Sequence, residues 1–68
     1  MKLRIELELE LDCRWLADIP ELRGVLAYGA TREEAAARVQ ALALRVLADR
    51  LEHGEGTNDF NHLTFVAA

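Results

Sequence analysis

Carboxylate side chains are the residues of this chain best suited to chemistry. Glu6, Glu8 and Glu10 alternate with leucines, and Asp18 and Glu21 follow a little further along. Paired carboxylates can hold a divalent metal ion or act in acid–base catalysis. A metal site of that kind needs a further carboxylate from another element, and none stands at a clear spacing. The acidic row is therefore interpreted as a solvated sheet face or, alternatively, as a docking surface for a basic partner.

The histidines and the single cysteine form weaker patterns. His53 and His62 fall on different predicted elements, where a helix-end charge and a strand-surface residue account for them better than a metal or catalytic pair does. Cys13 has only Arg14 as a basic neighbour, so its thiol is expected to be unreactive. The sequence contains no nucleophile–base pair and no glycine-rich phosphate loop. We therefore expect no enzyme activity, no metal and no cofactor.

Charge and composition indicate a small acidic protein. The 68 residues carry a formal net charge of −4, which argues against direct nucleic-acid binding, because that depends on Lys and Arg neutralising phosphates. A basic protein partner fits this charge better. One cysteine excludes an internal disulfide and agrees with a reducing cytoplasm. We expect no signal peptide and no membrane contact, since no run reaches the roughly 20 apolar residues of a membrane span.

The apolar content favours self-association. A chain of this length buries only about 60% of the surface that its unfolded form exposes, yet 51% of its residues are hydrophobic. That is more apolar side chain than one small core needs. We expect a homo-oligomer whose interface uses either a strand edge or the helix leucines Leu44, Leu47 and Leu51.

Alternation predicts a first hairpin with one buried face. The inward residues of the first strand are Leu3, Ile5, Leu7, Leu9 and Leu11, and those of the second are Trp15, Ala17 and Ile19. Trp15 is expected in the core. A two-residue loop would place Glu10 opposite Trp15 and mix the faces, whereas a three-residue loop over 12–14 places Leu11 opposite Trp15. We therefore predict the odd loop or an equivalent bulge.

The segment IPELRGVLAYGATREEA contains two turns and a helix start. Pro20 ends one extended run, and Gly24 opens the next. Gly29 is expected to supply backbone freedom where a strand turns into a helix. Thr31 and Glu34 form a capping box, in which each side chain accepts from an amide left unpaired at the helix start.

The remaining elements complete an α+β fold. A third strand is predicted over 25–30, a helix over 32–53 with Gly54 as its stop, a polar loop over 54–59 and a last strand over 61–67. The helix should face the sheet through Ala35, Val39, Leu42, Val46 and Asp49, with a second stripe of Ala36, Ala43, Leu47 and Arg50 beside it. The predicted architecture is a β-β-β-α-β mixed sheet of four strands in the order 3-2-1-4, with strand four parallel to strand one and one long helix on one face.

The pattern W-x-A-x-(I/V)-P-E-L-x-G-(V)-x-A-x-G-x-T-x-E-E-A, here residues 15–35, resembles the HicB-like antitoxin family of bacterial type II toxin–antitoxin systems. The resemblance implies a partial RNase H-like fold without nuclease residues. It also implies a non-catalytic antitoxin that binds and silences a small basic RNA-cutting toxin. Glu6, Glu8, Glu10, Asp18 and Glu21 would then contact that toxin. The alternative hypothesis is an orphan oligomeric scaffold or small-ligand binder of the same fold.

Three features depart from the family pattern. Asp12-Cys13 stands where members usually carry Asp-Gly in the first hairpin, so either the turn differs or Cys13 is strained. Arg23 stands where members often have proline. Many members continue into a DNA-binding helix-turn-helix or ribbon-helix-helix, whereas this sequence ends after its last predicted strand. We therefore expect residues 1–68 to form a single HicB-like domain without a C-terminal DNA-binding domain.

Overall fold

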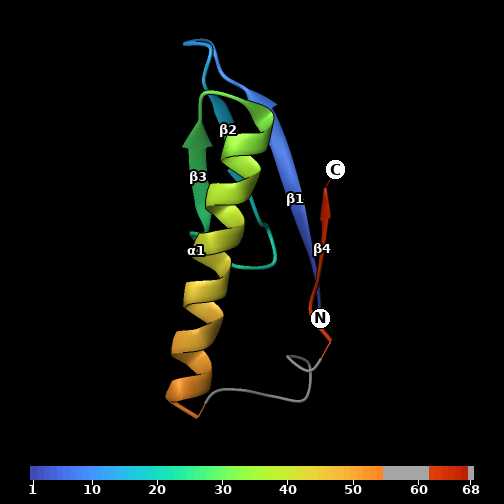
Figure 1. The fold of residues 1–68 in the computed structure, drawn as a ribbon, viewed down its shortest axis with the longest axis vertical. Helices are drawn as coiled ribbons and strands as arrows, with labels where there is room; N and C mark the ends of the chain where they lie inside the picture. Colours follow the sequence, from blue (N-terminus) through green and yellow to red (C-terminus); the bar gives the residue numbers. More distant parts are fainter. Residues whose placement is uncertain (55–61, 68) are drawn as a thin grey trace.

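The computed structural model describes residues 1–54 and 62–67. Its elements are β1 (Lys2–Leu9), β2 (Trp15–Asp18), β3 (Leu26–Gly29), α1 (Arg32–Glu52) and β4 (Thr64–Ala67). The strands form one sheet in the order β3-β2-β1-β4, in which β4 runs parallel to β1 and the other neighbours are antiparallel (Figure 1). The α+β class, the mixed sheet with its helix, the strand order and the direction of β4 are thus confirmed.

The core lies between α1 and one face of the sheet. Leu3 and Ile5 are each 1% exposed because alternate residues of β1 point toward the helix, as the period-two pattern predicts. Between β2 and β3, Leu22 and Val25 turn inward as well. The buried core residues are Leu3, Ile5, Ala17, Ile19, Leu22, Val25, Ala35, Val39, Ala43 and Leu47.

The buried side of α1 is rotated from the predicted stripe. The buried residues are Ala35, Val39, Ala43 and Leu47, which follow one another at intervals of four. Leu42 and Val46 are only half-buried, and Asp49 is exposed. Residues spaced four apart are slightly more than one turn apart in a helix of 3.6 residues per turn, so the row of buried residues shifts gradually around the helix. It therefore passes from the first predicted stripe into the second. The inclusion of Asp49 in the sheet-facing stripe was wrong.

The first hairpin has the predicted loop length at a shifted position. The Glu10 amide donates to the Arg14 carbonyl at 2.8 Å, and the Cys13 amide donates to the Glu10 carbonyl at 3.0 Å. Three residues therefore lie between Glu10 and Arg14, one position earlier than predicted. Cys13 has φ +68°, the left-handed conformation that such a loop demands and that glycine adopts more easily. Of the two expected alternatives, a different turn or a strained Cys13, the structure has the strained Cys13.

This shift corrects the predicted register by two residues. Leu9, and not Leu11, lies opposite Trp15, and Leu7 lies opposite Ala17. Because side chains alternate with a period of two, each residue of the pair keeps its predicted face. Leu11 is 105% exposed and Leu9 is 55% exposed, since the hairpin end projects beyond the first turn of α1 (Figure 1). The expectation that both leucines are buried was wrong.

Two consecutive turns join β2 to β3. The Leu22 amide donates to the Ile19 carbonyl at 2.9 Å, which places Pro20 at the second position of a β-turn. The Val25 amide then donates to the Leu22 carbonyl at 3.1 Å, and Gly24 has φ +80°. A positive φ at the third position of a turn favours glycine. Pro20 and Gly24 are therefore turn residues, as predicted.

Gly29 is needed for a different reason from the predicted one. Its φ is not in the left-handed region, but a Cβ there would lie 2.5 Å from the Ala35 nitrogen. The helix start thus lies directly against the backbone of β3. Thr31 caps the helix, as its Oγ1 accepts from the Glu34 amide at 3.0 Å. The Glu34 carboxylate accepts from the Ala30 amide at 2.7 Å, one residue before the cap.

The other boundaries differ from prediction by a few residues. β3 and β4 are each shorter than the runs 25–30 and 61–67, and α1 ends at Glu52 with His53 as its C-cap. Gly54 follows with φ +75°, so it stops the helix as expected. Apart from Gly54, the predicted polar loop lies outside the described residues, as does position 61. Within residues 1–54 and 62–67, no helix has the length and apolar character to cross a membrane.

Candidate functional site

The sheet face away from α1 is the candidate site. In the part of the chain that the structure describes, no element covers this open face (Figure 1). Alternation along each strand decides which side chains it carries. They are Lys2, Arg4, Glu6 and Glu8 from β1, Leu16 and Asp18 from β2, Leu26 and Tyr28 from β3, and Thr64 and Val66 from β4.

Three carboxylates gather at the middle of the open face. Glu6 lies directly opposite Asp18 across the β1–β2 pair, and Glu8 is opposite Leu16. These residues and Leu7 line a shallow hollow of about 180 Å³. We call Glu6, Glu8 and Asp18 the acidic sheet face. Like charges directly opposite each other destabilise a sheet, so the position of Glu6 against Asp18 opposes folding and favours a cation from outside.

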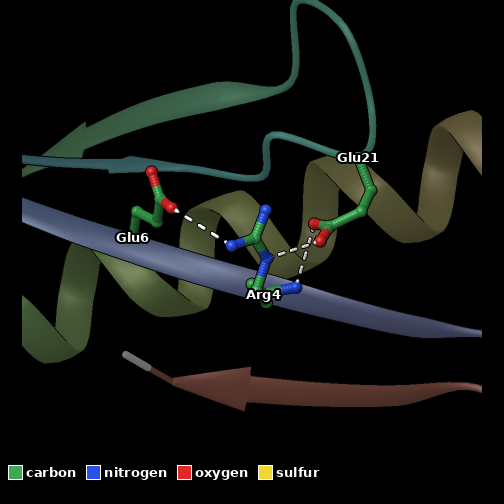
Figure 2. Close-up of polar contacts among 3 residues, drawn as sticks. All are labelled: Arg4, Glu6 and Glu21. Carbon is green, nitrogen blue, oxygen red and sulfur yellow. Dashed lines mark hydrogen bonds and ion pairs between the residues drawn. The ribbon is translucent and has the colours of Figure 1, made fainter.

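Arg4 and Glu21 form a clip at the edge of this surface (Figure 2). The Arg4 amide donates to Glu21 Oε1 at 3.1 Å, and Arg4 Nε donates to Oε2 at 2.7 Å. β2 ends at Asp18, opposite Glu6, so the Glu21 carboxylate satisfies a β1 amide that β2 does not reach. Both hydrogen bonds from Arg4 lower the pKa of the Glu21 carboxyl below its usual value. The bond from the guanidinium has the larger effect, and the bond from the amide has the smaller one.

The clip changes the role of one predicted partner residue. Arg4 Nη1 also lies 3.8 Å from Glu6 Oε2, but its short contact is to Glu21. Glu21 is therefore engaged within the chain, and we assign it to the support of β1 and not to a free docking surface. Glu8 and Asp18 make no ion pair among the described residues.

Glu10 lies apart from the other carboxylates of the acidic row. Because the hairpin begins at Glu10, this residue lines a separate depression together with Leu11, Asp12 and Arg14. Asp12 holds Arg14 there, with Arg14 Nε donating to Asp12 Oδ2 at 2.7 Å. Hydrogen bonds from Arg14 lower the pKa of the Asp12 carboxyl, and the bond from the Arg14 amide has the largest effect. The predicted row of Glu6, Glu8 and Glu10 is therefore divided between two places.

The open face also carries apolar side chains beside the carboxylates. Leu26 is 46% exposed, and Leu16 and Tyr28 are half-buried. The Arg14 guanidinium lies 4.2 Å from the centre of the Tyr28 ring. Site prediction from the sequence concentrated on charge and omitted this apolar strip. The alternation that placed Leu16 away from the core was the signal for it.

Trp15 lies at the border of the core. Its ring is half-buried, packs against the core and has the Arg32 guanidinium 5.4 Å from its centre. The helix is thus one of its neighbours, whereas Leu9 and not Leu11 lies opposite it. Trp15 belongs to the helix side of the sheet, so it is not part of the open face.

Two of the three predicted oligomer contacts lie on the outer side of α1. Leu44 is 49% exposed and Leu51 is 52% exposed, whereas Leu47 is only 5% exposed. Leu47 lies on the same line as Ala43 and belongs to the core of a single chain. Its assignment to an interface was wrong, whereas the side chains of Leu44 and Leu51 are accessible.

The two histidines lie far apart in the sequence: His53 is the C-cap of α1, and His62 precedes β4. The expectation that His62 is a strand-surface residue was wrong. His53 Nδ1 is 2.8 Å from the Asp49 carbonyl at the end of α1, and the carbonyl of His62 accepts from the N-terminal amine. Over the described ranges, no three residues of the types His, Cys, Asp and Glu come together as a metal site would require. No protein-family model, curated protein or solved structure matches the chain.

Proposed function

We propose that the chain is a cytoplasmic antitoxin of the HicB-like type, with a partial RNase H-like fold. In this role it binds a small basic RNA-cleaving toxin and blocks it without catalysing a reaction. The motif of residues 15–35 suggests the family, and the acidic sheet face supports a basic partner. The observation on which the proposal rests is the opposition of Glu6 and Asp18 on an uncovered sheet.

A basic partner would relieve the repulsion in this surface. Arg4 is a neighbouring cation, but its short ion pair is with Glu21 at 2.7 Å, and Glu6 is reached only at 3.8 Å. A Lys or Arg side chain placed in the hollow would lie beside Glu6, Glu8 and Asp18, which line it. Opposite charges on the two proteins would also accelerate their encounter.

The apolar strip gives this surface the mixed character of a protein interface. Leu16, Leu26 and Tyr28 lie beside the carboxylates on the open face. Protein interfaces combine an apolar centre with a polar rim, and tyrosine is common in them. A nucleic-acid site would instead need a basic surface. The combination of leucine, tyrosine and carboxylates therefore favours a basic protein over RNA itself.

The direct test uses the protein encoded by the neighbouring reading frame. Titration calorimetry at two salt concentrations measures binding, and an RNA-cleavage assay measures inhibition. We expect binding that weakens as salt rises, because exposed charges are screened beyond about 8 Å at physiological ionic strength. No binding and no inhibition would overturn the proposal and leave an oligomeric scaffold or small-ligand binder as the better explanation.

Charge reversal locates the binding surface. The double variant Glu6→Lys, Glu8→Lys should slow association on the order of tenfold and change dissociation less, since steering acts on the encounter. Asp49→Lys, on the exposed side of α1, is the control for a general change of charge. Glu10→Lys should have a smaller effect than Glu8→Lys because Glu10 lies at the hairpin. Equal effects at Asp49 and Glu8 would exclude the open face as the docking surface.

A further inference from the structure

The outward side of α1 carries a second apolar row that the chain's own core does not use. Its members are Ala37, Ala41, Leu44, Ala48 and Leu51, all exposed, at successive spacings of four, three, four and three residues. We call this row the outer helix stripe. The same spacing marks the contact line between two packed helices, where apolar residues repeat every 3.5 positions.

The outer helix stripe points away from the sheet. At 3.6 residues per turn, its centre lies roughly 140° around the helix from the centre of the buried line. The buried line runs from Ala35 to Leu47. A partner on the outer stripe would therefore touch neither the core nor the open sheet face. Leu44 and Leu51 are each about half exposed there.

We propose that this stripe is the contact surface for a second copy of the chain, which packs with its α1 antiparallel to the first. In this arrangement Ala41 packs against Leu51 of the second copy, and Leu44 packs against Ala48. The two-fold axis repeats both contacts, giving four layers that each combine one large and one small side chain. Alternation of large and small residues across facing positions fills an interface well.

The flanking charges favour the same register. Arg38 and Glu52 lie along one side of the stripe, and this alignment brings Arg38 of each copy close to Glu52 of the other. Glu52 makes no ion pair among the described residues, and Arg38 reaches Glu34 at only 3.6 Å. Both can therefore pair across the interface. One like-charge contact, between the two Arg45 side chains, lies near the axis, where long side chains can extend into solvent.

Other helix pairings fit less well. Moving one helix by seven residues in the antiparallel pair would place Ala37 against Ala48 and bring Arg38 near Arg45 of the second copy. A parallel pair would align alanine with alanine and leucine with leucine, leaving gaps in the alanine layers. The self-complementary charge and size pattern is thus the reason for choosing a second copy over an unrelated partner.

The expected dimer is weak but specific. The four layers run from Ala41 to Leu51, about 10 helical steps or about 15 Å of axis, which is short for an interface of standard size. We therefore expect a reversible dimer that forms at micromolar and higher concentrations. Because the open face lies on the other side of the sheet, both acidic sheet faces would point outward. If the proposed function holds, one dimer would bind two partner molecules.

Sedimentation equilibrium on the full chain tests the dimer without any partner. We expect a monomer–dimer equilibrium that the double variant Leu44→Lys, Leu51→Lys shifts to monomer, weakening association at least about tenfold. The control is Leu9→Lys, Leu11→Lys, which removes two exposed leucines from the hairpin end. A wild-type monomer at the highest concentrations, or equal effects of the two doubles, would overturn the proposal.

A charge swap tests the register. Arg38→Glu and Glu52→Arg should each weaken the dimer, because each places like charges across the interface, and the double variant should recover it. Arg38 also donates to the Tyr28 carbonyl at 3.0 Å, so the unfolding of every variant is measured. The double variant also lacks the bond to the Tyr28 carbonyl. Recovery of its dimerisation would therefore be due to the charge pair between positions 38 and 52 of the two copies. Failure to recover would exclude this register. Stoichiometry with the toxin is measured separately, so loss of toxin binding leaves the dimer result intact.

Discussion

The substitution Gly29→Ala tests how tightly α1 is joined to β3. A Cβ at position 29 would lie 2.5 Å from the Ala35 nitrogen, 2.9 Å from its Cα and 3.0 Å from the Glu34 carbonyl carbon. Ordinary contacts begin near 3.4 Å, so the first helical turn must move by about 0.9 Å. All three atoms belong to the backbone, and no side-chain rotation can remove the overlap.

The size of the effect follows from what this movement disturbs. Overpacking in a well-packed region costs about 1–3 kcal/mol. The same turn holds the bonds from the Glu34 amide to Thr31 and from the Ala30 amide to Glu34, and loss of a cap adds about 1 kcal/mol. We expect Gly29→Ala to destabilise the fold by about 3 kcal/mol, a large part of the roughly 3–10 kcal/mol available to a domain of this length.

Urea unfolding followed by circular dichroism measures this change, with Gly24→Ala as the matched control. Gly24 has φ +80° but nothing within 4 Å of the position of a Cβ. Its substitution should therefore cost only the conformational term of about 1 kcal/mol. If Gly29→Ala costs no more than Gly24→Ala, close approach is not the reason for glycine at position 29, and the inferred tight junction is wrong.

Three further substitutions test single contacts by the same unfolding measurement. Thr31→Ala should cost about 1 kcal/mol and Glu34→Ala a similar amount, because each leaves an amide unpaired; two unchanged midpoints would contradict the cap. Cys13→Gly should stabilise the hairpin by about 0.5–1 kcal/mol, since glycine adopts φ +68° without strain, and destabilisation would argue against that strain. The pKa of Glu21 is lowered in the fold, so its contribution is present above the usual glutamate pKa of about 4.3 and is lost as pH falls through the lowered value. The advantage of the natural chain over Glu21→Gln should therefore be complete at neutral pH and shrink as the solution is acidified below the usual glutamate pKa, and a constant difference would contradict the clip.

The hairpin shows which part of the fold was predictable from alternation. The pattern of leucines determined which face each residue of β1 occupies, but it could not determine where the turn begins. A shift of two residues leaves every side chain on its predicted face, so the sequence pattern does not distinguish Leu9 from Leu11 as the partner of Trp15. The backbone hydrogen bonds donated by the Glu10 and Cys13 amides in the turn determine the register.

Tertiary contacts account for the parts of the site that were not predicted. Glu21 and Glu6 are both acidic and both near strands in the sequence, yet only Glu21 meets an unpaired amide, 17 residues away at Arg4. That contact exists because β2 turns away from β1 after Asp18. Gly29 was correctly identified as a special position, but its reason is the proximity of Ala35, which no local pattern contains.

The open face combines two features that folding alone does not favour. The uncovered side of an antiparallel sheet is usually polar, but here Leu26 is 46% exposed beside the half-buried Leu16 and Tyr28. Glu6 and Asp18 oppose each other across neighbouring strands, where like charges destabilise the sheet. Departures from local stability rules are expected at functional sites. A partner with cations for the carboxylates and an apolar surface for the leucines would compensate both, and this is the physical basis for proposing that the sheet is the binding surface.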